Sequence, residues 1–139
     1  MVVAIPSRGR AGRTKSDALI PSATLFVPEV EVESYRDATK ATVVGVPISV
    51  RGITATRNWI LEHIDDPRVV FIDDDVQRAG WWEAYADRHE LRELSEEQWL
   101  REWEVLFGIA ESSKYRVWGL STTDGPIYHH PHRPFLFRT

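Results

Sequence analysis

The sequence predicts an α/β fold, in which helices flank a mostly parallel sheet, as a single domain over residues 1–139. Two observations support this prediction. Short apolar runs alternate with helical patterns along the chain, and this order is typical of a parallel sheet covered by helices. The run Val69-Val70-Phe71-Ile72 is apolar throughout, as in a strand that is buried on both faces of such a sheet. No repeat, low-complexity segment or linker divides the chain.

The composition limits the class of protein. Hydrophobic residues make up 42% of the chain and charged residues 27%, which is typical of a globular fold. The net charge of −4 excludes a wholly electrostatic nucleic-acid binder, so such a partner would need a local basic patch. The absence of cysteine excludes disulfides and cysteine-ligated zinc. No apolar stretch has the length of a membrane span or a signal peptide, so we expect a cytoplasmic protein without a membrane partner.

The first half of the chain carries three apolar runs and three candidate helices. We expect strands over residues 2–5, 24–27 and 41–46. Thr14 and Asp17 have the spacing of a capping box, which predicts a short helix that ends before Pro21. Residues 30–39 form an acidic segment of one or two helical turns. Residues 54–63 have the pattern of a helix with one apolar face.

The second half begins with the strand over residues 69–72 and contains one long helix. Ser95 and Gln98 have capping-box spacing at the start of this helix. Its apolar residues share one face, which we expect to be buried: Trp99, Trp103, Leu106, Phe107 and Ala110. The charged segment 83–94 predicts a helix or a mobile lid over the site. Residues 115–120 have the pattern of a further strand.

Three carboxylates follow the buried strand, at the edge where open α/β sheets bind ligands: Asp73, Asp74 and Asp75. In an extended chain Asp73 and Asp75 would point the same way and Asp74 the opposite way. Adjacent carboxylates repel one another unless a cation or donor groups offset their charge. Oxygen ligands suit Mg²⁺ or Mn²⁺ shared with substrate phosphates, so we predict a metal at Asp73 and Asp75. The alternative is an acidic surface turn that ends a strand.

The loop after the first strand is basic and rich in glycine. It begins with Pro6 and Ser7 and continues with Arg8, Gly9, Arg10, Gly12, Arg13 and Lys15. Glycines let a backbone approach a ligand closely, guanidinium groups bind phosphate oxygens in pairs, and a helix N-terminus favours an anion. The loop therefore suits a phosphate. The alternative is a solvated basic turn.

The segment Arg51-Gly52-Ile53-Thr54-Ala55-Thr56-Arg57-Asn58 also leads from a strand into a helix. In a parallel sheet this loop, the basic loop and the aspartates lie at the same edge. A nucleoside diphosphate bridged to the aspartates by a divalent cation would satisfy both signs of charge. The alternative is an ordinary capped helix with an exposed arginine.

In this order, the segments 2–8, 52–58 and 71–75 resemble the donor half of a GT-A fold glycosyltransferase over roughly residues 1–125. The chain is most similar to the TET-associated glycosyltransferases of phages, which modify DNA. The resemblance implies a Rossmann-like domain that transfers a sugar from a nucleoside-diphosphate sugar to a hydroxymethylated pyrimidine in DNA. It also implies Mn²⁺ or Mg²⁺ as cofactor, bound at the Asp-x-Asp motif, and the host cytoplasm as location.

The resemblance further assigns roles to the candidate residues. Asp75 would bind the metal directly, and Asp73 would contact the donor ribose or a metal-bound water. Arg8 and its loop would lie near the nucleoside, and Arg57 and Asn58 near the diphosphate-sugar. A glutamate after the second strand would meet the base, with three candidates: Glu29, Glu31 and Glu33.

GT-A enzymes carry the acceptor site, the catalytic base of inverting members and a late metal-binding histidine beyond the fourth strand. We therefore expect the acceptor half to be incomplete and the chain to be truncated at its C-terminus. Asp124 is the candidate base, although Asp124-Gly125 also suits a simple turn. The late ligand has three candidates that also suit bystanders in an extended loop: His129, His130 and His132.

Aromatic residues and two rival functions complete the predictions. Trp81 and Trp82 suit either a platform for a sugar or base, or core packing. A nucleotidyltransferase would also need paired aspartates, a metal and a basic loop, but its donor-activating lysine has only Lys15 as a poorly spaced candidate. The other rival is a non-catalytic nucleotide-sugar-binding module.

Overall fold

The computed structural model describes residues 1–84 and 89–117. The chain divides into two compact units, Met1–Arg78 and Ala79–Thr139. Two compact units can belong to one domain, so the single domain over residues 1–139 stays a prediction.

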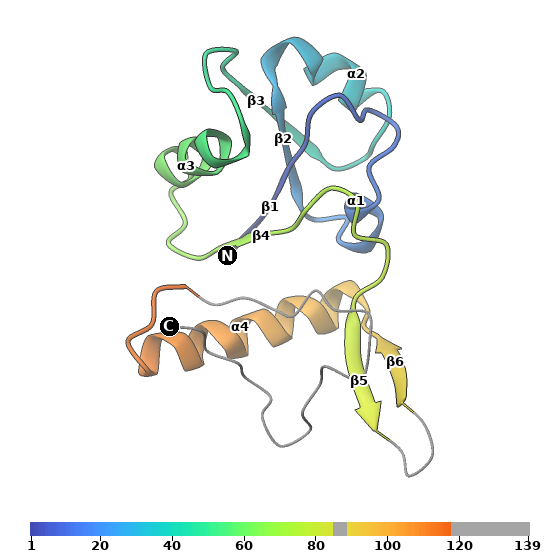
Figure 1. Ribbon diagram of the computed structural model, residues 1–139, viewed down its shortest axis with the longest axis vertical. Coiled ribbons are helices and arrows are strands. Elements are labelled where there is room, and N and C mark those ends of the chain that lie inside the picture. The colour runs from blue at the N-terminus through green and yellow to red at the C-terminus, as the bar shows by residue number, and fades with distance from the viewer. Residues whose placement is uncertain (85–88, 118–139) are drawn as a thin grey trace. The chain divides into compact units, whose positions relative to one another are not determined.

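The first unit contains a four-stranded parallel sheet, which confirms the predicted fold class (Figure 1). Its strands are β1 (Val2–Pro6), β2 (Thr24–Pro28), β3 (Thr42–Val46) and β4 (Val69–Phe71), in the order β3-β2-β1-β4. The strand before the aspartates is one residue shorter than predicted. Ile72 leaves the strand, although its N–H still donates to the Ala4 carbonyl at 3.1 Å.

Helices cover both faces of this sheet, with α3 on one side and α1 and α2 on the other (Figure 1). Their bounds are α1 (Ser16–Leu19), α2 (Val32–Arg36), which follows the 3₁₀ turn η1 (Glu29–Glu31), and α3 (Ile53–His63). The core beneath α3 consists of Ala4, Phe26, Val46 and Ile60. Strand residues of the opposite parity, including Val3, Ile5, Leu25 and Val27, are buried as well. Both faces of the sheet are therefore apolar, as a parallel sheet requires.

The predicted capping box at the start of α1 is wrong. The N-cap residue is Lys15, and no side chain caps it. Asp17, expected to close the box, instead accepts a hydrogen bond from the Thr39 hydroxyl at 2.6 Å. The Lys15 N–H donates to the Asp74 carbonyl at 2.9 Å, and the Ser16 hydroxyl donates to the Asp73 carbonyl. Contacts with the aspartate turn, remote in sequence, override the local capping signal.

The second unit contains an antiparallel hairpin where a helix or lid was predicted over residues 83–94. Strand β5 (Gly80–Ala84) pairs with β6 (His89–Glu93), with Trp81 opposite Arg92. A Cβ at position 80 would lie 2.1 Å from the Arg92 carbonyl oxygen, so the close approach of the strands requires glycine there. Cross-strand pairing thus replaces the predicted helix at residues 83–84 and 89–93, and a lid over the site stays a prediction.

Helix α4 (Glu96–Ser112) confirms the predicted capping box. The Ser95 hydroxyl accepts from the Gln98 N–H at 3.3 Å, and the Gln98 side chain accepts from the Ser95 N–H at 2.9 Å. Four of the five predicted apolar residues are buried, namely Trp99, Trp103, Leu106 and Ala110, and Phe107 is half-buried. The predicted strand over 115–120 is not formed at 115–117, and the rest lies outside the described residues. Lys114 has φ 61° and the Tyr115 N–H donates to the Ala110 carbonyl at 2.8 Å, so this backbone closes the end of α4.

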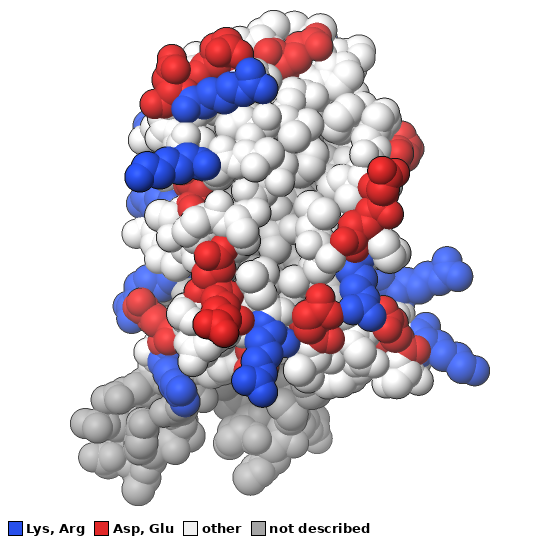
Figure 2. Space-filling model, turned by 180° about the vertical axis from the view of Figure 1, so that it is seen from behind, with Lys and Arg blue, Asp and Glu red and all other residues white. Residues whose placement is uncertain are grey.

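Charged side chains of both signs are intermingled on the face drawn in Figure 2. No helix in residues 1–84 and 89–117 is long and apolar enough to cross a membrane.

Candidate functional site

The candidate site lies at the carboxyl edge of the sheet, where the strand order changes direction. The chain passes from β3 at one edge to β4 at the other, so β1 lies between its partners β2 and β4. In open parallel sheets such a point leaves a crevice that binds ligands. A cavity of about 400 Å³ occurs at this edge. Eight predicted site residues line it: Pro6, Ser7, Arg8, Arg10, Gly52, Asp73, Asp74 and Asp75.

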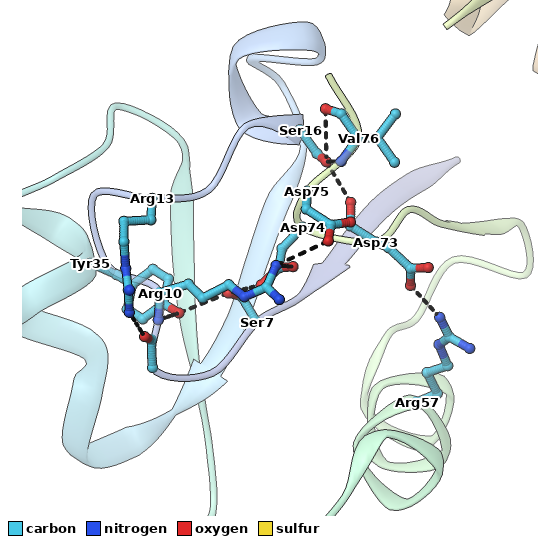
Figure 3. Close-up of polar contacts among 11 residues, drawn as sticks. Ser7, Arg10, Arg13, Ser16, Tyr35, Arg57, Asp73, Asp74, Asp75 and Val76 are labelled. Atoms are coloured by element: carbon cyan, nitrogen blue, oxygen red, sulfur yellow. Dashed lines mark hydrogen bonds and ion pairs between the residues drawn. The ribbon is translucent and has the colours of Figure 1, made fainter. Parts of the chain in front are cut away.

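The three aspartates do not alternate as predicted for an extended chain. Asp74 and Asp75 lie in a turn, and one nitrogen, Nη1 of Arg10, binds both of them (Figure 3). The distances are 2.9 Å to Asp74 Oδ1 and 3.2 Å to Asp75 Oδ2. Asp73 points toward α3, where Arg57 Nη2 binds its Oδ1 at 2.8 Å. Two arginines therefore offset the charge of the cluster.

The aspartates differ in their access to solvent. The Asp74 side chain is 14% exposed, whereas those of Asp73 and Asp75 are 69% and 60% exposed. Asp74 uses its second oxygen, Oδ2, to accept a hydrogen bond from the Ser7 hydroxyl at 2.5 Å. Asp74 therefore holds the turn in place, and Asp73 and Asp75 remain accessible to a ligand.

The basic loop presents side chains rather than backbone amides. The Gly9 N–H donates to Glu31 Oε2 at 2.6 Å, and the Arg10 N–H donates to the Tyr35 hydroxyl at 2.9 Å. Helix α1 has only four residues. Protein groups therefore already accept the hydrogen bonds of these two amides, and the predicted use of the loop for a phosphate stays a prediction. Arg8, by contrast, is exposed and lines the cavity.

Hydrogen bonding to Asp75, followed by the charge of Asp74, raises the pKa of Arg10 above its usual value. The guanidinium between the two aspartates is therefore a permanent cation.

The start of α3 faces the same cavity. Gly52, Ile53 and Thr56 line it, and Gly52 has φ +86°, a conformation that favours glycine. No side chain caps this helix of eleven residues. Its first N–H groups and the positive end of its dipole therefore suit an anion.

Arg57 and Asn58, the other predicted residues of this helix, are not among the cavity-lining residues. The Arg57 guanidinium carbon lies 5.6 Å from the centre of the Phe71 ring and its Nη2 reaches Asp73. Asn58 is exposed.

A model of the family described as TET-Associated Glycosyltransferase matches residues 1–138 of the chain. The chain belongs to this family. The match confirms the resemblance noted in the sequence and covers more of the chain than the donor motifs do. No curated protein and no solved structure shows a significant match. The cavity is therefore the candidate active site of a glycosyltransferase.

The residues of this glycosyltransferase fit a divalent cation shared with a substrate. Asp73 and Asp75 offer accessible carboxylate oxygens at the cavity, and Mg²⁺ and Mn²⁺ commonly combine one or two carboxylates with water and phosphate oxygens. Within residues 1–84 and 89–117, no group of three or more His, Cys, Asp or Glu side chains could hold a metal ion. The donor set thus suits a metal whose coordination the substrate completes.

The candidate glutamates of the glycosyltransferase all serve other contacts. Glu29 accepts from the Ile48 N–H at 3.2 Å, Glu31 accepts from Gly9, and Glu33 pairs with Arg36 at 2.9 Å. None of the three is among the cavity-lining residues.

The remaining predicted residues belong to the second unit, Ala79–Thr139. Trp81 is 38% exposed on β5, and the side chain of Trp82 lies outside the described part. Four further candidates also lie outside the described residues: Asp124, His129, His130 and His132.

Sequence reasoning missed two hydroxyl groups that organise this site. Tyr35 binds Ser7 and Arg10, and Ser16 binds the backbone of Asp73 and Val76 (Figure 3). The available signal for Tyr35 was a single aromatic residue in an otherwise acidic segment. Ser16 gave no signal beyond the capping pattern.

Proposed function

We propose that this glycosyltransferase transfers a sugar from a nucleoside-diphosphate sugar, with Mn²⁺ or Mg²⁺ held by Asp73 and Asp75. One observation carries the proposal: Arg8 and Arg10, an uncapped helix N-terminus and three aspartates meet at one cavity of about 400 Å³. This volume is within the usual range for small-molecule sites. A diphosphate bridged to carboxylates by a cation suits a site that contains both signs of charge.

The walls of the cavity suggest how the donor lies. Phe26, Val46 and Val50 form an apolar wall, which suits a nucleobase. Arg8, Arg10 and the first amides of α3 suit the diphosphate oxygens. The sugar would then lie beside the aspartates.

In the transfer, the bond between the anomeric carbon and the diphosphate oxygen breaks. A new bond forms from that carbon to an acceptor hydroxyl oxygen, the hydroxyl proton passes to a base, and the nucleoside diphosphate leaves. Arg8 and Arg10 stabilise the charge on the leaving diphosphate, as does the N-terminus of α3. When bound, the divalent cation supplies further neutralisation of that charge.

For the acceptor we propose a hydroxymethylated pyrimidine in DNA. Arg13 of the basic loop is exposed and not among the cavity-lining residues, so it supplies a cation for DNA phosphates in a chain with net charge −4. A DNA acceptor predicts that activity falls steeply with salt, because phosphate contacts release counterions. A flat salt response with active enzyme would indicate a small-molecule or protein acceptor.

Family membership favours glycosyl transfer over nucleotidyl transfer. Lys15, the candidate activating lysine of a nucleotidyltransferase, is not among the cavity-lining residues. Product analysis separates the possibilities. Release of a free nucleoside diphosphate indicates glycosyl transfer, release of pyrophosphate indicates nucleotidyl transfer, and binding without turnover indicates a non-catalytic module.

The donor site is tested by thermal unfolding with a panel of nucleoside diphosphates and their sugars, each with and without Mn²⁺. Ligand at one hundred times its Kd stabilises a protein by about 2.7 kcal/mol. We expect a stabilisation that needs both Mn²⁺ and one nucleotide, and that Asp75→Ala abolishes. The matched control is Asp65→Ala, since Asp65 is exposed and is not among the cavity-lining residues. Equal stabilisation of wild type and Asp75→Ala would refute the metal assignment.

A further inference from the structure

Tyr35 combines complete burial with a polar group. It is the largest of the fully buried side chains among the described residues, with 1% of its surface exposed. It belongs to α2, a helix of five residues, and is not among the cavity-lining residues. A buried hydroxyl is costly unless it is hydrogen-bonded, so its partners reveal its role.

The Tyr35 hydroxyl is the middle of a directed chain of hydrogen bonds (Figure 3). The Asp74 carboxylate can only accept, so the Ser7 hydroxyl donates its proton to Asp74 Oδ2 at 2.5 Å. The Tyr35 hydroxyl must then donate to Ser7 Oγ, at 2.7 Å. The Tyr35 oxygen in turn accepts from the Arg10 N–H at 2.9 Å. Each hydroxyl is satisfied both as donor and as acceptor.

This chain closes on itself through the side chain of Arg10. Asp74 Oδ1, the oxygen not bound by Ser7, accepts from Arg10 Nη1 at 2.9 Å. Arg10 is therefore fixed at both ends, by its backbone amide to Tyr35 and by its guanidinium to Asp74. The same guanidinium nitrogen lies 3.2 Å from Asp75 Oδ2. The ring thus determines where this cation stands at the cavity.

The loop that carries Arg10 would otherwise have considerable freedom. Gly9 and Gly12, with φ +66° and +70°, stand on either side of Arg10. Glycine has the largest conformational freedom of any residue, so contacts from outside the loop are needed to hold one conformation. Glu31 holds the Gly9 amide and Tyr35 holds the Arg10 amide.

We propose that the Tyr35 hydroxyl is a positioning group of the donor site, which acts through Arg10 and Asp74 and does not touch the ligand. The inference rests on the proposed function of this cavity. A phenylalanine would fill the same space in the core, so the hydroxyl itself serves the geometry of the basic loop and the aspartate turn.

The test uses Tyr35→Phe, which removes only the oxygen, and inorganic pyrophosphate with Mn²⁺ as the diphosphate probe. We expect the variant to stay folded and to bind the probe about tenfold more weakly, as expected when a preorganised charge contact is lost. Ile60→Val, at a fully buried position of α3, is the control for a core change without a polar role. Its probe affinity should equal that of wild type at comparable stability.

A double-mutant cycle with Arg10→Gln separates positioning from general destabilisation. If Tyr35 acts through Arg10, Tyr35→Phe should cost little further affinity once Arg10 is replaced. Additive losses of affinity would overturn the inference. A second readout needs no ligand: hydrogen exchange of loop amides over residues 9–13 should be faster in Tyr35→Phe than in Ile60→Val.

The outcomes distinguish the two levels of the argument. Failure of wild type to bind any metal-nucleotide pair or the probe would refute the proposed function, and the inference with it. Binding by wild type that Tyr35→Phe retains in full, with unchanged loop exchange, would refute the inference and leave the proposed function standing.

Discussion

Replacing Ser7 by alanine should destabilise the fold far more than its size suggests. Ser7 is 8% exposed, and its hydroxyl both donates to Asp74 and accepts from Tyr35. Ser7→Ala removes a hydrogen bond to a charged group and leaves the buried Tyr35 hydroxyl without an acceptor. Each loss costs about 1–3 kcal/mol, and because the two share one atom we expect a total of about 3 kcal/mol.

Thermal and urea unfolding followed by circular dichroism measure this cost. At about 4 °C per kcal/mol for a chain of this length, Tm should fall by about 12 °C. Ser34→Ala is the matched control, because Ser34 is exposed on α2 and its replacement should change stability by less than about 0.5 kcal/mol.

The double variant Ser7→Ala/Tyr35→Phe sharpens the test. With both hydroxyls gone, no hydroxyl is left without an acceptor, and the Arg10 N–H loses its acceptor in Tyr35→Phe and in the double variant alike. The destabilisation of the double variant should therefore be smaller than the sum of the two single variants. If Ser7→Ala proved as stable as Ser34→Ala, the hydrogen-bonded ring would contribute nothing to the free energy of unfolding, and the reasoning would be refuted.

Three further predictions concern other parts of the chain. Gly80→Ala should destabilise the β5–β6 hairpin, because its Cβ would lie 2.1 Å from a carbonyl oxygen. A Cβ at Gly108 on α4 would meet nothing within 4 Å, so Gly108→Ala should stabilise the protein by about 0.5–1 kcal/mol, and the Tm values of the two variants test both expectations. The N-terminal ammonium binds Asp66 at 2.5 Å, and this hydrogen bond lowers the pKa of Asp66. A lowered folded-state pKa stabilises the fold at neutral pH, and this stabilisation is lost as the pH falls below about 4. In a pH series of urea melts, Asp66→Asn should therefore be less stable than wild type at pH 7 and approach its stability at pH 3. A stability difference that stays constant with pH would contradict the assignment. Arg10→Gln should bind Mn²⁺ alone more tightly than wild type, because the variant removes a competing cation from Asp75, and it should bind Mn²⁺ with pyrophosphate more weakly. Electron paramagnetic resonance of free Mn²⁺ measures both affinities. The control Arg13→Gln, which loses a contact to the Gly9 carbonyl, should change neither affinity.

The elements that were predicted correctly are those whose determining residues lie close together along the chain. The α4 capping box lies within four consecutive residues, and the apolar run before the aspartates identifies a parallel strand by composition alone. The hairpin was missed because its evidence is pairwise: Gly80 matters only once β6 lies beside it, with Glu93 opposite and the Arg92 carbonyl oxygen where a Cβ would stand. Charge in the intervening segment suggested a helix, and cross-strand pairing overrode it.

The candidate site shows the same limit. Eight of the predicted residues line one cavity, because strand ends in a parallel sheet share one edge, and their roles stay predictions. Their orientations were not predictable, since each aspartate is turned by a partner distant in sequence: Arg10 is 64 residues from Asp74, and Arg57 is 16 residues from Asp73. Tyr35 escaped notice because its hydroxyl acquires a role only when Ser7, 28 residues away, lies beside it.

The closed backbone of the β1–α1 loop bears on how this enzyme family can diversify. A loop that binds phosphate with main-chain amides keeps its preference for phosphate through most substitutions, because every residue type except proline has the same N–H group. In this loop the Gly9 and Arg10 amides are bound by Glu31 and Tyr35, so under the proposed function donor recognition would depend on exposed side chains such as Arg8. We therefore expect that single substitutions of such side chains would change the donor preference without changing the backbone of the loop.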